Sequence, residues 1–153
     1  MFLIAHRGNR VGRVTECENN PKYVMEALAE GFDAEIDVWW RAGSFWLGHD
    51  NPQYKITMEF LTVQSLWCHA KNLDAVEQLA NQQSIHWFWH EADKVTITSK
   101  GYIWTLPGVS VPRSIVNQPS DIIRSFETNP LGICADDFKS LIRKQENKWK
   151  KLT

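Results

Sequence analysis

The sequence predicts an α/β fold, a compact (β/α)8 barrel in which several crossover helices are shortened or missing. Strand-like and helix-like segments alternate along the chain, which is typical of a parallel sheet. Eight segments read as strands, and this number favours a closed barrel over its competitor, an open doubly wound sheet. The chain has 153 residues, fewer than the roughly 200 at the lower end for such barrels. Some helices must therefore be reduced to loops.

The strand candidates are short apolar runs or segments of alternating polarity. The run Phe2–Ala5 is apolar and bounded by polar residues, as in a buried strand. Asp33–Val38 alternates strictly between polar and apolar residues, which is the period of a strand. The eight candidates, in chain order, are Phe2–Ala5, Asp33–Val38, Phe45–Gly48, Leu66–Ala70, Ile85–His90, Tyr102–Thr105, Ser114–Asn117 and Gly132–Ala135.

Helices are predicted between some of these strands. One begins at Pro21 after the N-cap Asn20 and ends near Gly31. A second follows the N-cap Asn72, with Leu73, Val76 and Leu79 predicted on one buried face. Two more are expected from Ser120 and from about Asp137, the last with a basic end.

One region has no room for a helix, because Val95–Thr98 alternates like a strand and turns directly into Tyr102–Thr105. No linker-like composition divides the chain. We therefore expect one domain over residues 1–153.

Composition excludes several classes of protein. With 17 basic and 18 acidic residues, the net charge of −1 gives no field that would attract nucleic acid. No apolar run approaches the roughly 18 residues of a membrane-spanning helix. The three cysteines are widely spaced, which argues against a disulfide scaffold or a cysteine-rich zinc site. We expect a cytoplasmic protein.

Polar side chains gather at the ends or on one face of the predicted strands. In a parallel barrel, the carboxyl ends of the strands meet at one rim, where catalytic groups lie. Each group taken alone has a simpler explanation, since a lone histidine is commonly a surface residue and two acidic residues can form a solvated face. The residues that converge on the predicted rim are His6, Arg7, Glu35, Asp37, His49, His69 and Lys71.

The residue types at this rim suit phosphate chemistry. Glu35 and Asp37 are two apart on a strand, so they point the same way and repel unless a cation such as Mg²⁺ or Ca²⁺ lies between them. Two histidines can accept and donate protons near neutral pH. Arg7 and Lys71 add positive charge suited to a phosphate. Together these groups describe a phosphodiester-cleaving site.

The order and spacing of these blocks resemble the glycerophosphodiester phosphodiesterase family. The resemblance spans residues 2 to 137 and is densest in the first 50. The blocks that carry it are His6-Arg7-Gly8, Glu18-Asn19, Gly31 leading to Glu35-Ile36-Asp37-Val38, His49-Asp50, His69-Ala70-Lys71, Ile103-Trp104-Thr105 and Gly132-Ile133-Cys134-Ala135-Asp136.

The resemblance implies a TIM barrel that hydrolyses a small-molecule phosphodiester. By likeness, a neighbouring substrate hydroxyl displaces the alcohol, and water then opens the cyclic phosphate. The cofactor would be a divalent cation, Mg²⁺ or Ca²⁺, with Mn²⁺ as the alternative. The implied roles are His6 and His49 as the acid–base pair, Arg7 and Lys71 as phosphate contacts, Glu35 and Asp37 as metal ligands, and Glu18 as a support for the metal or the first loop.

The sequence departs from the family pattern at two places. The third acidic metal ligand is replaced by His69, which either contacts the ion or only forms hydrogen bonds within the rim. The insertion that usually follows the strand of His49 is missing, because Asn51–Tyr54 runs on directly. The substrate is thus a glycerophosphodiester-like or a sugar- or polymer-linked phosphate. The alternative function is a catalytically weak or inactive barrel that binds a phosphorylated ligand; an interaction module rests only on the eight Trp residues.

Overall fold

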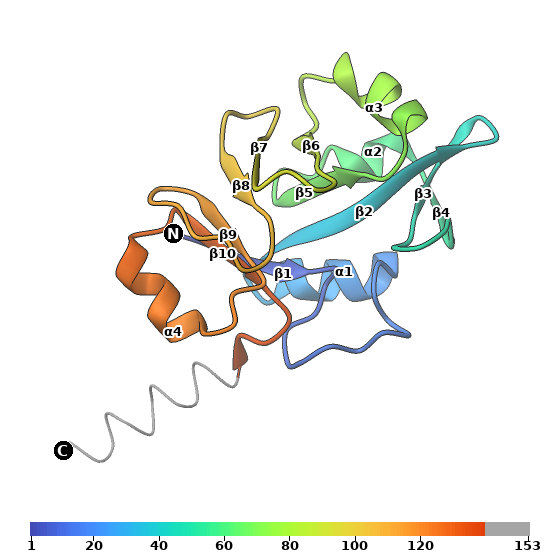
Figure 1. The fold of residues 1–153 in the computed structure, drawn as a ribbon. Coiled ribbons are helices and arrows are strands. Elements are labelled where there is room, and N and C mark those ends of the chain that lie inside the picture. The colour runs from blue at the N-terminus through green and yellow to red at the C-terminus, as the bar shows by residue number, and fades with distance from the viewer. Residues whose placement is uncertain (140–153) are drawn as a thin grey trace.

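The computed structural model describes residues 1–139, and these form a ten-stranded sheet that curls into a half-barrel (Figure 1). The strands are β1 (Phe2–His6), β2 (Asp33–Arg41), β3 (Ser44–Leu47), β4 (Tyr54–Ile56), β5 (Leu66–Ala70), β6 (Trp87–Trp89), β7 (Val95–Ile97), β8 (Ile103–Thr105), β9 (Ile115–Asn117) and β10 (Gly132–Ala135). Seven of them are parallel, in the order β6-β5-β2-β1-β10-β9-β8. The antiparallel strands are β7, which pairs with β8, and β3 and β4, which extend from β2.

The helices are short and few, and they cover only parts of the sheet. They are α1 (Pro21–Ala29), α2 (Met58–Leu61), α3 (Leu73–Ala80), α4 (Ile122–Ser125) and the 3₁₀ helix η1 (Phe126–Thr128). The prediction of a (β/α)8 TIM barrel is therefore wrong: the fold is mostly sheet, and helices do not alternate with the strands.

The first reason lies in the turn after β2. Arg41 and Ser44 pair across an antiparallel hairpin, joined only by Ala42 and Gly43. Both turn residues have positive φ angles, of 49° and 70°, as two-residue hairpin turns require. The predicted strand Phe45–Gly48 exists as β3, but it runs antiparallel to β2 because a two-residue turn cannot make a parallel crossover.

The second reason lies between β7 and β8. Ile97 pairs with Ile103, so residues 98–102 form the whole connection. A parallel crossover needs a dozen or more residues, and this connection is too short for one. Within residues 1–139 no strand pairing joins β6 to β7, so the curled sheet stays open there.

Several local predictions are confirmed. The strands β5 and β10 coincide with the predicted ranges. Asn20 caps α1 by accepting a hydrogen bond from the Lys22 backbone N–H at 2.9 Å, and Asn72 caps α3 in the same way. The predicted burial of Leu73 is wrong, since 73% of it is exposed. Strand β4 and helix α2 were not predicted, and the predicted C-terminal helix lies largely outside the described residues.

The concave side of the sheet is filled by an apolar layer. Alternate residues of the parallel strands point inward, and those near the middle of the strands are large and buried. This layer consists of Ile4, Trp67, Phe88, Trp104, Ile115 and Cys134. It closes the half-barrel below its carboxyl-end mouth. The inward residues nearer the carboxyl ends, such as His6, Asp37 and His69, are polar and stand above it.

The convex side is covered by helices. Helix α3 buries Ala75 and Leu79 against the outward residues of β2 and β5. Helix α1 buries Val24 in the same cluster and Ala27 against the outward residues of β1 and β10. Burial of such apolar faces contributes about 25 cal/mol per Å² removed from water and holds the parallel strands in register. No helix among residues 1–139 is long and apolar enough to cross a membrane.

A buried histidine at the amino end of the half-barrel gives stability a specific pH dependence. His86 lies 4.1 Å from the Trp67 ring and 2.8 Å from Thr98 Oγ1, and burial together with the charge of Lys100 lowers its pKa from 6.5 to about 4. The unfolded chain therefore binds more protons between these two pH values. We expect the free energy of unfolding to fall as pH is lowered from about 6.5 to 4. Below about pH 4 both states bind this proton, so His86 no longer contributes to the pH dependence of stability.

The variant His86→Gln isolates this effect, because an amide can still hydrogen-bond to Thr98 but does not titrate. Denaturant unfolding of both proteins at several pH values measures the free energy of unfolding. The wild type should lose more stability than the variant between pH 6.5 and 4. Parallel curves for the two proteins would show that His86 is not the responsible group.

Candidate functional site

A pocket of about 370 Å³ opens at the carboxyl ends of the parallel strands. The strands β1, β2 and β5 are adjacent and parallel. Residues at their carboxyl ends therefore meet at this pocket, although they are far apart in the sequence. The register places His6 beside Glu35 and Asp37 beside His69. The predicted site residues that line the pocket are His6, Arg7, Glu35, His49, His69 and Lys71.

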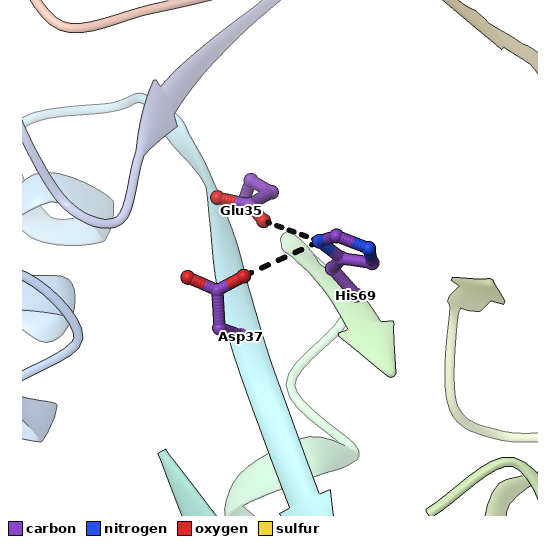
Figure 2. A group of neighbouring side chains, drawn as sticks. All are labelled: Glu35, Asp37 and His69. Atoms are coloured by element: carbon purple, nitrogen blue, oxygen red, sulfur yellow. Dashed lines mark ion pairs between the residues drawn. The ribbon is translucent and has the colours of Figure 1, made fainter. Parts of the chain in front are cut away.

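The centre of the site is a cluster of Glu35, Asp37 and His69. Figure 2 shows the two carboxylates projecting from β2 towards the imidazole on β5. His69 Nδ1 lies 3.2 Å from Asp37 Oδ1 and 3.7 Å from Glu35 Oε1. One ligand atom from each of the three residues lies within 4.8 Å of the others, close enough to hold one metal ion.

The two oxygens of Asp37 have different surroundings. Oδ2 contacts Asn19 Nδ2 at 2.9 Å, Arg7 Nε at 2.9 Å and His49 Nδ1 at 3.2 Å. Oδ1 is buried and accepts no hydrogen bond from the residues that the structure describes, although Lys71 Nζ lies 3.5 Å away. Burial opposes the charge of Asp37, but the interactions with His49 and His69 and the charge of Arg7 keep the pKa of this carboxyl well below its usual value. Asp37 is thus an ionised carboxylate with one oxygen left for a cation.

The orientation of His69 fixes where its lone pair points. Its Nε2 lies 2.9 Å from the His90 carbonyl oxygen, and because a carbonyl only accepts, Nε2 carries the hydrogen. In the neutral ring, Nδ1 then has a lone pair directed at the two carboxylates. The ring also stacks on Phe88, with the centroids 5.0 Å apart and the planes 3° from parallel. A ring held this way by a backbone carbonyl is the usual arrangement of a metal-binding histidine.

Glu35 completes the cluster and is almost fully buried. Its Oε2 accepts a hydrogen bond from the Arg7 backbone N–H at 3.3 Å and lies 3.9 Å from His6 Nε2. Burial and the adjacent negative charge of Asp37 raise the pKa of Glu35. The ionised form of Glu35 is therefore disfavoured beside Asp37, and a cation between the two carboxylates would relieve this repulsion.

Arg7 stands in a tight turn after β1. Its φ angle is 53°, and the next residue has a φ angle of 87°. Glycine suits this next position for two reasons: the positive φ disfavours other residues, and a Cβ there would lie 3.0 Å from the Tyr23 ring and 3.3 Å from the backbone of α1. The turn directs the guanidinium towards Asp37, with Nη1 2.9 Å from Glu18 Oε2 and Nη2 3.3 Å from His49 Nε2. Since an arginine has five N–H donors, two remain for a ligand in the pocket.

Glu18, predicted to support the metal or the first loop, lies on the loop side. Its Oε1 contacts Arg13 Nε at 2.7 Å and Asn9 Nδ2 at 3.2 Å, and its Oε2 accepts a hydrogen bond from Arg7 Nη1. Burial opposes its charge, but these hydrogen bonds lower the pKa of Glu18 below its usual value. Both oxygens are occupied, so Glu18 positions Arg7 and is absent from the cluster of Glu35, Asp37 and His69.

His6 is paired with an aspartate that sequence analysis gave no role. His6 Nδ1 lies 2.8 Å from Asp136 Oδ1, 130 residues away, and donates its hydrogen to that carboxylate. Nε2 then faces the pocket near Glu35. Burial opposes protonation, but the hydrogen bond to Asp136 and the charge of Glu35 raise the pKa of His6 above its usual value.

His49 and Lys71 lie on the opposite side of the cluster. His49 Nε2 lies 3.3 Å from Arg7 Nη2, and because an arginine only donates, this nitrogen is the acceptor and Nδ1 donates to Asp37. Lys71 Nζ, at the end of β5, lies 3.5 Å from Asp37 Oδ1 and lines the pocket. All four cationic or titratable groups predicted for phosphate binding and acid–base chemistry thus surround one cavity.

Several residues of the site were missed. Asp136 directly follows β10, so the rule of strand-end polar residues that selected His6 could have found it. Asn19, which binds both the side chain and the backbone N–H of Asp37, belongs to the Glu18-Asn19 block of the resemblance but received no role, because it stands in a loop where the strand-end rule does not apply. Phe88 and the His90 carbonyl, which hold His69, become visible only when β5 and β6 are paired.

Comparisons of the chain with protein-family models, with curated proteins and with solved structures find no match. The resemblance of its motifs to the glycerophosphodiester phosphodiesterases has no support from these comparisons. The chemistry of the site rests on its own geometry.

Proposed function

We propose that this chain is a divalent-metal-dependent hydrolase of small-molecule phosphodiesters. One observation carries the proposal: the buried Asp37 Oδ1, which accepts no hydrogen bond from the described residues, faces a histidine nitrogen whose other N–H is fixed by a backbone carbonyl. Two lone pairs facing each other at 3.2 Å repel unless a cation lies between them. Lys71 Nζ, 3.5 Å from Asp37 Oδ1, supplies part of that charge, and a metal ion between the two atoms would supply the rest. The adjacent buried Glu35 favours a divalent ion, since two carboxylates need more than one positive charge.

The ligands of this ion would be Glu35, Asp37 and His69. A bound divalent cation would supply Lewis-acid stabilisation of the negative charge that develops on the phosphoryl oxygens. Two N–H donors of Arg7 and the ammonium of Lys71 face the same pocket, where they would bind the remaining phosphate oxygens. Substrate binding thus places the phosphorus beside the histidines.

Proton transfer falls to His6 and His49. His6, whose pKa is raised by Asp136, is protonated at Nε2 and donates a proton to the leaving alcohol oxygen. His49 has an acceptor lone pair at Nε2, which takes a proton from the attacking oxygen. This oxygen belongs to a neighbouring hydroxyl where the substrate has one, and to water for an ester such as bis(p-nitrophenyl) phosphate that has none. After the first transfer His6 is neutral and His49 is charged, so the two exchange roles when water completes hydrolysis.

The motif resemblance supports a glycerophosphodiester or a sugar-linked phosphate as the substrate. The short connection after His49 leaves the mouth of the pocket without the covering insertion of that family, which favours a less enclosed alcohol group. The three free cysteines suit a reducing compartment, and we place the enzyme in the cytoplasm.

Hydrolysis of bis(p-nitrophenyl) phosphate tests the function. The purified chain should release p-nitrophenolate when Mg²⁺, Ca²⁺ or Mn²⁺ is added, and a chelator should stop the release. Readdition of the metal should restore it. A metal-treated, folded protein that hydrolyses neither this ester nor a glycerophosphodiester would contradict the proposal.

One observation favours a binding protein as the second candidate. His49 Nε2 is already engaged by Arg7, so a substrate hydroxyl must displace that contact before His49 can act as a base. A protein that only binds a phosphorylated ligand would not need this displacement. Binding of glycerol 3-phosphate without hydrolysis of any ester would identify this second function.

The nature of the third ligand predicts the metal preference. Imidazole nitrogen suits borderline ions such as Mn²⁺ or Zn²⁺, whereas carboxylate oxygen suits Mg²⁺ and Ca²⁺. We therefore expect His69→Glu to tighten Mg²⁺ and Ca²⁺ binding relative to Mn²⁺. Isothermal titration of the wild type and the variant measures the ratio of the dissociation constants. An unchanged ratio in a folded variant would mean that His69 is not a ligand.

A further inference from the structure

A fourth histidine lines the same pocket and has no part in the proposed chemistry. We propose that His90 is a substrate-binding residue whose Nδ1 accepts a hydrogen bond from a hydroxyl group on the alcohol portion of the phosphodiester. This inference rests on the proposed function and specifies its substrate class, phosphodiesters of a hydroxyl-bearing alcohol such as a polyol or a sugar.

The tautomer of His90 follows from its one hydrogen bond. Nε2 lies 2.5 Å from the carbonyl oxygen of Asp93, and a carbonyl can only accept, so Nε2 carries the hydrogen. The neutral ring then has its lone pair on Nδ1. No residue within 1–139 forms a hydrogen bond with this nitrogen. Nδ1 is also not one of the fully buried polar atoms that lack a partner. Nδ1 is therefore an accessible acceptor.

His90 lies in the wall of the pocket beside the cation cluster. His90 is two residues beyond Phe88 along β6 and its loop, so both side chains point to the concave side of the sheet. Phe88 stacks on the ring of His69, and the His90 carbonyl binds His69 Nε2 at 2.9 Å. His90 is thus adjacent to the cation cluster, and only 9% of it is exposed, at the pocket wall.

The other polar groups of the cluster bind anions or cations, and His90 differs from them. Arg7 and Lys71 donate hydrogen bonds to phosphate oxygens, and the carboxylates attract positive charge. A lone pair does not bind a phosphate oxygen, and His90 lies outside the group of side chains whose ligand atoms are within 4.8 Å of one another, so its acceptor is not placed to hold the same ion. It matches a donor on the substrate, and in a phosphodiester that carries no amine the donor is a hydroxyl group.

Two amide variants separate the roles of the two ring nitrogens. In His90→Gln, the side-chain amide can reach the position of Nε2 and keep the bond to Asp93, but the acceptor at Nδ1 is lost. In His90→Asn, the shorter side chain places its oxygen near the position of Nδ1 and loses the bond to Asp93. Neither change touches the His90 carbonyl that orients His69.

The experiment compares two esters with the same chromogenic leaving group in the presence of Mn²⁺. One is glycerol p-nitrophenyl phosphate, which carries hydroxyl groups, and the other is bis(p-nitrophenyl) phosphate, which carries none. We expect His90→Gln to lower kcat/KM about tenfold for the glycerol ester and less than about twofold for the bis-aryl ester. His90→Asn should retain most of the activity towards the glycerol ester.

Other results overturn the inference. Equal losses on both esters would show that the ring acts through the structure of the site, and no loss on either would show that it does not touch the substrate. A larger loss of kcat/KM for the glycerol ester in His90→Asn than in His90→Gln would show that the side chain acts only through its hydrogen bond to the Asp93 carbonyl. A wild-type chain inactive on both esters would instead contradict the proposed function, and the inference with it.

Discussion

Glu35→Gln is expected to weaken Mn²⁺ and Mg²⁺ binding at least about a hundredfold, because loss of a direct ligand should cost more than the 10- to 100-fold typical of an outer-shell partner. The same change should raise the free energy of unfolding of the metal-free protein. Burial and the charge of Asp37 raise the pKa of Glu35, so its ionised form is disfavoured in the fold at neutral pH. A neutral amide of the same shape removes this penalty.

Isothermal titration measures the affinity, and denaturant unfolding with and without metal measures the stability. Saturating metal should stabilise the wild type and leave Glu35→Gln nearly unchanged. The matched control is Glu91→Gln, which removes a glutamate from the exposed wall of the same pocket and should alter neither quantity appreciably. If Glu35→Gln bound metal as well as the wild type, Glu35 would not be a ligand.

Loss of His6 should have the second large effect. We expect His6→Ala to lower the rate of phosphodiester hydrolysis about 10²- to 10⁴-fold, the usual contribution of a general acid–base residue. His49→Ala should lose activity in the same range. The variant His86→Gln, at the opposite end of the half-barrel, should stay within about twofold of the wild type because its side chain does not line the pocket. A folded His6→Ala variant that loses less than about tenfold would remove His6 from the mechanism.

Asp136→Asn tests how the protein tunes His6. The pH–rate profile should be bell-shaped, and its limbs report the apparent pKa values of the coupled pair. Asp136 raises the pKa of His6 through a hydrogen bond at 2.8 Å, so removing its charge lowers that pKa. If His6 is the acid, the alkaline limb should move to lower pH. A limb that stays in place would assign it to another group.

The sequence by itself determined which side chains share a strand face and where the first helices begin. Period-two alternation places Glu35 and Asp37 together, and His69 with Lys71, because side chains two apart on a strand point the same way. Asn20 and Asn72 mark helix starts, since a side-chain oxygen satisfies a free backbone N–H within a few residues. These rules depend on neighbours in the chain, so they can be applied without knowing the fold.

The tertiary structure alone decided how these local features combine. The turn at Ala42 and Gly43 reverses the chain, so that β3 joins β2 antiparallel and the sheet is not a closed ring of alternating strands and helices. The pairing of β1 with β10 brings Asp136 to His6, and the packing of the first loop occupies Glu18 with arginines. Such contacts join residues from 5 to 130 positions apart. Their geometry depends on the curvature and pairing of the whole sheet, which local periodicity does not encode.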